Sequence, residues 1–217
     1  MTRAERLQAD WYFDVISPYA YLQAEQLWRL DPHLNIRHRP VLFAGLLNHW
    51  GQKGPAEIPA KRRFTFRYAL WRGTRQGLAL KAPPAHPFNP LKLLRLALVL
   101  DSTREAVLET FRFVWREGKS ADDPRDWAAL CRRLGVPDAD ARIAQPQVKQ
   151  ALRQNVEEAI AAGVFGVPTL IVAGELFWGD DATDMVLDWI AGAPIFASPE
   201  MARIETLPEA ASRLTRT

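Results

Sequence analysis

The chain has 217 residues, of which 48% are hydrophobic and 24% are charged. This composition is typical of a globular protein, and it excludes a disordered, collagenous or fibrous chain. The 28 Lys and Arg residues nearly balance the 25 Asp and Glu residues, which leaves a formal net charge of +3. So small an excess gives no electrostatic case for a nucleic acid or an acidic membrane as partner, and we expect neither.

Cysteine content and hydropathy predict the cellular compartment. The single cysteine, Cys131, cannot close an internal disulfide, and we expect it to pack inertly inside the protein. The first residues hold no apolar core of signal-peptide length. The longest apolar stretch, residues 93–100, is interrupted at Arg95 and is too short to cross a bilayer. These features favour a soluble cytoplasmic protein.

The first 44 residues predict a strand, a helix and a second strand. Residues 10–15 are aromatic-rich and alternate as in a strand. Ser17 before Pro18 marks a helix start, because a serine caps well and a proline needs no amide donor at the first helical position. The second strand is expected over residues 35–41, and the strands of such a βαβ unit are usually parallel.

After residue 44 the composition changes, and the strand pattern stops. Residues 45–62 are rich in Gly and Pro and predict a long loop. Residues 61–77 read as a helix with aromatic residues on one side, which we expect to pack into the core: Phe64, Tyr68 and Trp71.

Four further helices are expected after a proline-rich loop that begins at Ala82. They span residues 91–100, 102–118, 127–135 and 148–163. The second of these is expected to begin at Ser102, with Glu105 completing a capping box.

The end of the chain returns to strands. They are expected over residues 167–172 and 175–178, with Ala173-Gly174 as the hairpin turn. An amphipathic helix follows over residues 182–190.

The order βαβ, helical block, ββα, with a proline opening the third strand, is the thioredoxin arrangement. We expect an α/β protein whose thioredoxin-like domain is split into residues 1–44 and 161–217, with an all-helical domain inserted over residues 45–160. Redox members carry Cys-x-x-Cys after the first strand, whereas this chain has Ser17-Pro18-Tyr19-Ala20. A serine cannot cycle between thiol and disulfide, so a self-contained oxidoreductase is not expected.

Five segments, spread from the first strand to the last predicted helix, carry a family resemblance. They are FDVISPYAYL (13–22), GPAEIPAKRRF (54–64), HPFNP (86–90), FGVPT (165–169) and LFWGDD (176–181). In this order they resemble the glutathione-dependent 2-hydroxychromene-2-carboxylate isomerases and their DsbA-like relatives, the kappa-class glutathione transferases. The resemblance implies glutathione as cofactor, a small aromatic carboxylate as substrate, and a homodimer.

Ser17 is the catalytic residue that the resemblance implies. A glutathione sulfur at this helix start is stabilised as a thiolate by unpaired amides and the helix dipole, and the Ser17 hydroxyl can donate a further bond to it. The plainer interpretation is that Ser17 is only a helix cap.

Two further pieces would hold the rest of glutathione. By resemblance, Pro168 is cis and the backbone of Val167 pairs with the cysteinyl part, although an ordinary proline at a strand start is the alternative. At Asp180 and Asp181, helix amides would receive the γ-glutamyl carboxylate while an aspartate accepts its ammonium. The alternative for Asp181 is that it only caps the last helix.

The remaining candidates lie in less constrained segments. Gln52 stands where the family often has a ligand-contacting asparagine, and Lys61 would hold a carboxylate of glutathione or substrate. His86 lies where a relative places a substrate-contacting aromatic, and His49 and Trp50 would line the same cleft.

Plainer interpretations stand beside these. Lys61 also belongs to a basic helix face that we expect to be mostly solvated, together with Arg62, Arg63, Arg67, Arg72 and Arg75. No cluster of His, Cys and Asp has metal-binding spacing, so no metal is expected.

The resulting hypothesis is a glutathione-dependent isomerase. As the family implies, the thiolate adds to a conjugated carbon, the ring opens, a bond rotates, and elimination returns glutathione. The first alternative is a kappa-class-like transferase or peroxidase with another acceptor pocket. The second is a non-catalytic thioredoxin-like binding module.

Overall fold

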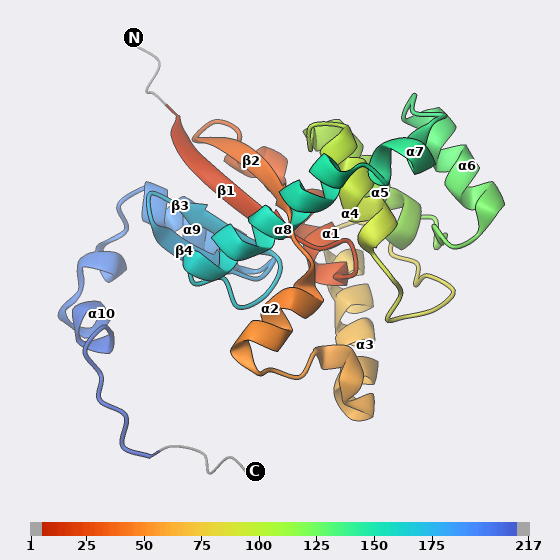
Figure 1. The fold of residues 1–217 in the computed structure, drawn as a ribbon. Helices are drawn as coiled ribbons and strands as arrows, with labels where there is room; N and C mark the ends of the chain where they lie inside the picture. Colours follow the sequence, from red (N-terminus) through yellow and green to blue (C-terminus); the bar gives the residue numbers. More distant parts are fainter. Residues whose placement is uncertain (1–5, 212–217) are drawn as a thin grey trace.

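A four-stranded mixed sheet forms the centre of the computed structural model, which describes residues 6–211 (Figure 1). Its strands are β1 (Leu7–Phe13), β2 (Leu34–Pro40), β3 (Thr169–Val172) and β4 (Glu175–Trp178), in the order β2-β1-β3-β4. β1 and β2 are parallel, whereas β3 runs antiparallel to both β1 and β4. The expected α/β thioredoxin-like arrangement and its parallel βαβ unit are therefore confirmed.

The helices α1 (Pro18–Ala24) and α9 (Ala182–Ile190) belong to the βαβ and ββα units that make up this sheet. α1 connects β1 to β2 and continues into a 3₁₀ turn, η1 (Leu27–Leu30). α9 follows β4, and η3 (Pro194–Ala197) and α10 (Pro199–Ile204) come after it. Ala173 and Gly174 join β3 to β4 with φ values of 50° and 90°, which is the backbone that a tight hairpin requires, so the predicted turn is confirmed.

The chain between β2 and β3 consists of helices and the loops that connect them. It contains α2 (Phe43–Trp50), η2 (Pro55–Glu57), α3 (Pro59–Arg75), α4 (Leu91–Val99), α5 (Arg104–Trp115), α6 (Pro124–Arg133), α7 (Ala139–Ile143) and α8 (Pro146–Ala161). In Figure 1 α4–α7 gather beside the sheet, and α8 brings the chain back to it. In the part of the chain described, no helix is both long and apolar enough to cross a membrane.

One apolar cluster joins the sheet to these helices. Trp11 and Phe13 of β1 stack on each other at 4.8 Å, and Phe13 packs against Phe111 of α5 at 5.5 Å between ring centroids. All three side chains are fully buried, and Cys131 lies in the same cluster as expected. The core therefore runs without a break from β1 into the helical segment, and the division at residues 44 and 160 stays a prediction.

Two helix starts differ from expectation. Part of the predicted loop over residues 45–62 is helix α2, which its buried Leu46 anchors to the protein. The capping box at Ser102 is wrong, because Asp101 and Ser102 both have left-handed backbones, with φ values of 53° and 49°. A cap residue has an extended backbone, and here Thr103 takes that place before α5.

The packed side of α3 also differs from expectation. Phe64 and Trp71 are 65% and 56% exposed, so the prediction that this aromatic side enters the core is wrong. The buried residues of α3 are instead Ala69 and Gly73. A Cβ added at Gly73 would lie 3.4 Å from a methyl of Leu22, so α3 packs closely on α1 through its small residues and leaves its rings outside.

Candidate functional site

Ser17 lies where β1 passes into α1. Its Oγ accepts a hydrogen bond from the Ala20 amide at 3.2 Å, and Pro18 occupies the first helical position, so the predicted helix start is confirmed. The same Oγ lies 3.5 Å from the carbonyl oxygen of Val167, which is 150 residues away in sequence. Ser17 is 8% exposed. The fold thus brings a serine hydroxyl to the segment that opens β3.

The Val167–Pro168 peptide is cis, as predicted. The Pro168 carbonyl accepts from the Gly179 amide at 2.9 Å. Among the described residues, the Val167 amide makes no backbone–backbone hydrogen bond. The Val167 amide therefore has no backbone acceptor, whereas the Val167 carbonyl already accepts from Ser17.

The buried Asp14 organises the loop that leads from β1 to Ser17. Its Oδ1 accepts from the Ile16 amide at 3.0 Å, and its Oδ2 accepts from the Phe43 amide at 2.8 Å. The side chain is wholly buried, and burial raises the pKa of Asp14 to about 7, against the opposing effect of the two backbone donors.

The two carbonyls of this loop accept from side chains of the helical segment. Trp115 Nε1 donates to the Val15 carbonyl at 2.7 Å, and His86 Nε2 lies 3.0 Å from the Ile16 carbonyl. The His86 ring packs against the rings of Phe66, Phe88 and Trp115. The peptide bond between His86 and Pro87 is the second cis bond in the described residues. Burial, as the largest cause, lowers the pKa of His86.

Asp180 lies between β4 and α9 and pairs with an arginine that we expected to be solvated. Arg72 of α3 donates to Asp180 Oδ2 through Nε at 2.9 Å and through Nη2 at 2.7 Å. The Asp180 side chain is 5% exposed, and burial raises its pKa although the Arg72 charge opposes this. Only the tertiary structure reveals Arg72 at this place, since its sequence context is one of several arginines on one helix.

A pocket of about 140 Å³ opens beside this ion pair. Its lining is polar and carries both charges: Gln26, Arg29, Arg72, Gln76, Asp180, Asp181, Thr183 and Asp184. Asp181 is exposed and precedes α9, but its side chain makes no capping hydrogen bond, so the capping interpretation is wrong. The pocket has the charges needed to bind a zwitterionic group.

Tyr19 connects the surroundings of Ser17 with those of Asp180. Its hydroxyl donates to the Thr65 carbonyl of α3 at 3.4 Å, and its ring lies 6.3 Å from that of Tyr68. The Arg72 guanidinium lies over the other aromatic ring of this contact, 5.8 Å from the Tyr68 centroid. Burial raises the pKa of Tyr19 to about 12, so its phenol stays protonated. Ser17 and Asp180 therefore lie on either side of the contact that Tyr19 of α1 makes with α3.

The other candidate residues are exposed. Trp50, at the end of α2, donates through Nε1 to the Val164 carbonyl at 2.9 Å, which places it near the segment leading to Val167, and His49 packs edge-on against it. Gln52 and Lys61 are exposed, and neither side chain has a hydrogen bond or ion pair within residues 6–211.

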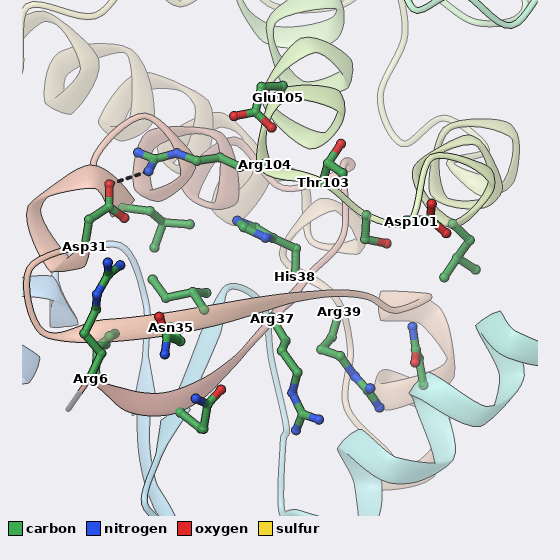
Figure 2. A pocket seen from close by; sticks show the side chains of 17 residues that line it. Arg6, Asp31, Asn35, Arg37, His38, Arg39, Asp101, Thr103, Arg104 and Glu105 are labelled. Carbon is green, nitrogen blue, oxygen red and sulfur yellow. Dashed lines mark hydrogen bonds and ion pairs between the residues drawn. The ribbon is translucent and has the colours of Figure 1, made fainter.

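A larger cavity, of about 790 Å³, lies elsewhere, along β2 and the segment between α4 and α5. Figure 2 shows His38 pointing into it and Arg104 paired with Asp31, at 2.5 Å. Burial lowers the pKa of His38 to about 4. No candidate site residue lines this cavity. In the described residues, no group of three or more His, Cys, Asp or Glu side chains could hold a metal ion.

A family model described as "DSBA-like thioredoxin domain" matches residues 8–191. The chain therefore belongs to the DsbA-like thioredoxin family.

The chain is similar to proteins named as kappa glutathione transferases and to proteins named as 2-hydroxychromene-2-carboxylate isomerases. It is 28% identical over 206 residues to "Glutathione s-transferase kappa 2" of Caenorhabditis elegans, covering 83% of this chain and 90% of that protein. It is 26% identical over 194 residues to "2-hydroxychromene-2-carboxylate isomerase" of Pseudomonas sp. (strain C18), covering 86% and 91%. A solved structure of a 2-hydroxychromene-2-carboxylate isomerase matches 90% of this chain and 99% of its own, with a TM-score of 0.77. At 22% identity, that last likeness shows the fold.

Proposed function

We propose that this protein is a glutathione-dependent isomerase of the 2-hydroxychromene-2-carboxylate type, with Ser17 as the catalytic residue. The observation that carries the proposal is the position of the Ser17 hydroxyl beside the cis Val167–Pro168 peptide, 3.5 Å from the Val167 carbonyl. Membership of the DsbA-like family and relatives named as isomerases and glutathione transferases support it.

Ser17 acts on the sulfur of glutathione through its hydroxyl proton. Its oxygen already accepts from the Ala20 amide, and its bond to the Val167 carbonyl is long. The proton can therefore turn to a sulfur placed beside it. A hydrogen bond to the charged form favours that form, so the thiol of bound glutathione ionises at a lower pH.

The polar groups beside Ser17 suit the remainder of the tripeptide. The Val167 amide, which has no backbone partner, pairs with the cysteinyl residue, and the γ-glutamyl end reaches the pocket of about 140 Å³. There Arg72, oriented by Asp180, binds the carboxylate, and the exposed Asp181 accepts the ammonium. Gln52 and Lys61 supply contacts to the other carboxylate.

The acceptor is a small aromatic or chromene carboxylate, held near α2 by His49 and Trp50. The thiolate adds to a conjugated carbon of the acceptor, and the ring opens. After rotation about the bond that has become single, elimination restores the double bond and returns glutathione unchanged. The protein contributes orientation and a stabilised nucleophile.

A kappa-class-like transferase or peroxidase is the second candidate, favoured by the relative that carries the kappa name. Turnover of a chromene carboxylate without net consumption of glutathione separates the two, because a transferase consumes glutathione. Calorimetry that detects no glutathione binding would instead favour a non-catalytic thioredoxin-like module. The homodimer and the cytoplasmic location stay predictions of the sequence.

The decisive experiment compares two serines with the same local structure. Ser17 and Ser198 each cap a helix, each precede a proline, and each accept from the amide three residues on at 3.2 Å. Ser17→Ala and Ser198→Ala should therefore lose similar stability, about 1 kcal/mol each.

Only Ser17→Ala should remove the thiolate. We expect its turnover to fall about 100-fold, as when one donor to a developing anion is deleted. Ultraviolet titration of bound glutathione gives the thiol pKa in each variant. An unchanged pKa in Ser17→Ala would reject the catalytic role.

A further inference from the structure

The peptide that enters Ser17 is fixed at both of its polar ends. Its N–H, on Ser17, donates to the Asp14 carbonyl at 3.1 Å. Its carbonyl, on Ile16, is engaged by His86 Nε2 at 3.0 Å. The preceding carbonyl, on Val15, is engaged by Trp115. The carbonyls of β1 accept hydrogen bonds from neighbouring strands. After β1 ends, the side chains of Trp115 and His86 supply the donors for the next carbonyls instead.

We propose that His86 is a positioning residue for Ser17, which it serves by donating its Nε2–H to the Ile16 carbonyl. This inference rests on the proposed function. It assigns His86 a role different from the substrate contact that the sequence predicted. Trp115 supports the same loop one residue earlier, through the Val15 carbonyl.

The direction of the Ile16 carbonyl matters because it lies one bond from the residue that stabilises the thiolate. A peptide plane fixed at both ends sets the direction of the Ser17 side chain. Loss of His86 would leave the part-buried Ile16 carbonyl without its donor, and the carbonyl would turn to find another one. A donor in the adjacent residue that can compete for this carbonyl is the Ser17 hydroxyl, whose own bond to Val167 is long.

The geometry also fixes the form of the imidazole. A carbonyl oxygen can only accept, so the hydrogen must lie on His86 Nε2, and in the neutral ring Nδ1 has a lone pair. Nδ1 is buried and has no hydrogen-bond partner among the described residues. Protonation of Nδ1 would bury an unpaired donor, so His86 remains a neutral donor and does not serve as a general base.

The surroundings of His86 reinforce this form. Three aromatic rings pack on it, from Phe66, Phe88 and Trp115. The charged group that acts on it is Arg62 of α3, and this positive charge also opposes protonation.

Two substitutions at one position separate the donor from the ring. His86→Phe keeps an aromatic ring among aromatic neighbours but removes the donor. His86→Gln replaces the donor, since its amide nitrogen can take the place of Nε2. His33, exposed in the turn before β2, provides the control variant His33→Gln.

We expect His86→Phe to raise the pKa of bound glutathione by about one unit, which is about tenfold less thiolate at a pH below that pKa. Its kcat should fall by a similar factor while the KM of the aromatic carboxylate stays constant. His86→Gln should regain most of both losses, and His33→Gln should match the parent protein.

A raised KM with unchanged kcat and thiol pKa would instead establish a substrate contact and overturn the proposal. Equal losses in His86→Gln and His86→Phe would overturn it in favour of ring packing.

A measurement without glutathione keeps this inference distinct from the proposed function. Nitrogen NMR of the histidine-labelled parent protein reports which ring nitrogen carries the hydrogen. We expect the neutral Nε2–H form for His86. The Nδ1–H form would overturn the positioning role even if glutathione binds and turns over. Conversely, the Nε2–H form in a protein that binds no glutathione would reject the proposed function and leave the His86 bond intact.

Discussion

Two Arg–Asp ion pairs, each beside a different pocket, are similar in length but differ in how far their side chains are exposed to water. Arg72 and Asp180 are 2.7 Å apart beside the small polar pocket, and their side chains are 19% and 5% exposed. Arg104 and Asp31 are 2.5 Å apart at the larger cavity, with exposures of 28% and 46%. Water screens the second pair far more than the first.

Under the proposed function the smaller pocket binds glutathione, so cavity size alone would not identify the functional site. The cavity of about 790 Å³ is open along an edge strand, and its ion pair is solvated. The pocket of about 140 Å³ holds buried opposite charges contributed by two distant segments, α3 and the start of α9. Buried charges are costly unless they are matched, so their presence marks a place where the structure is adapted to polar contacts.

The largest expected effect comes from breaking the buried pair. Arg72→Met leaves Asp180 as a buried charge without its partner, and we expect it to lose about 3 kcal/mol of unfolding free energy. Arg75→Met, on the exposed face of the same helix, should change it by less than about 0.5 kcal/mol. Urea denaturation measures both. The double variant Arg72→Met/Asp180→Asn should recover part of the loss, and no recovery would mean that packing dominates.

A second, smaller effect concerns pH and the buried Asp14, at the loop before Ser17. Its pKa is about 7 in the folded protein, against an ordinary value of 3.8, so the folded state keeps a proton that the unfolded state releases. The stability contributed by protonated Asp14 is therefore complete below about pH 4 and is lost progressively as the pH rises to about 7.

Asp14→Asn should remove this part of the pH dependence, because an amide does not titrate in that range. The readout is the slope of unfolding free energy between pH 4 and 7, since the amide also loses one of the two acceptors and lowers stability at every pH. Asp122→Asn, at an exposed carboxylate, is the control. Identical slopes in Asp14→Asn and the parent protein would show that Asp14 is ionised in the fold.

The smallest effect is expected at the larger cavity. Arg104→Met removes a solvent-screened pair and should cost at most about 1 kcal/mol. Glutathione-dependent turnover should stay within about twofold of the parent rate, a change smaller than 0.5 kcal/mol in the barrier. A tenfold loss of turnover would reverse the comparison and make the cavity part of the functional site.

Much of the fold could be predicted because its signals are local. Ser17-Pro18 predicts a helix start from two adjacent residues, and Ala173-Gly174 predicts a hairpin from its own backbone requirement. The missed helix α2 lacks a capping side chain and lies among Gly and Pro residues. Its existence depends on Leu46 reaching the core, which is a tertiary condition.

The site could be predicted only in part. Ser17, Val167 and Asp180 were named from segments that resemble a family, and the fold brings Ser17 and Val167 together. Arg72 was missed because it is one of six similar cations along α3, and only packing selects the one that faces Asp180. The exposed side of α3 was likewise misjudged, since helical periodicity groups its aromatic rings without saying what covers them.

The amino-acid sequence by itself determined the order of strands and helices, the serine that caps α1 in place of a thiol, and the proline that opens β3. These depend on the conformational preferences of neighbouring residues. The tertiary structure decided which side of α3 is packed, which arginine meets Asp180, and which donors hold the carbonyls before Ser17. Those choices depend on contacts between segments that lie far apart in the sequence, such as the hydrogen bond between Trp115 and Val15, which are 100 residues apart. The pattern of neighbouring residues carries no information on the free energy of such contacts.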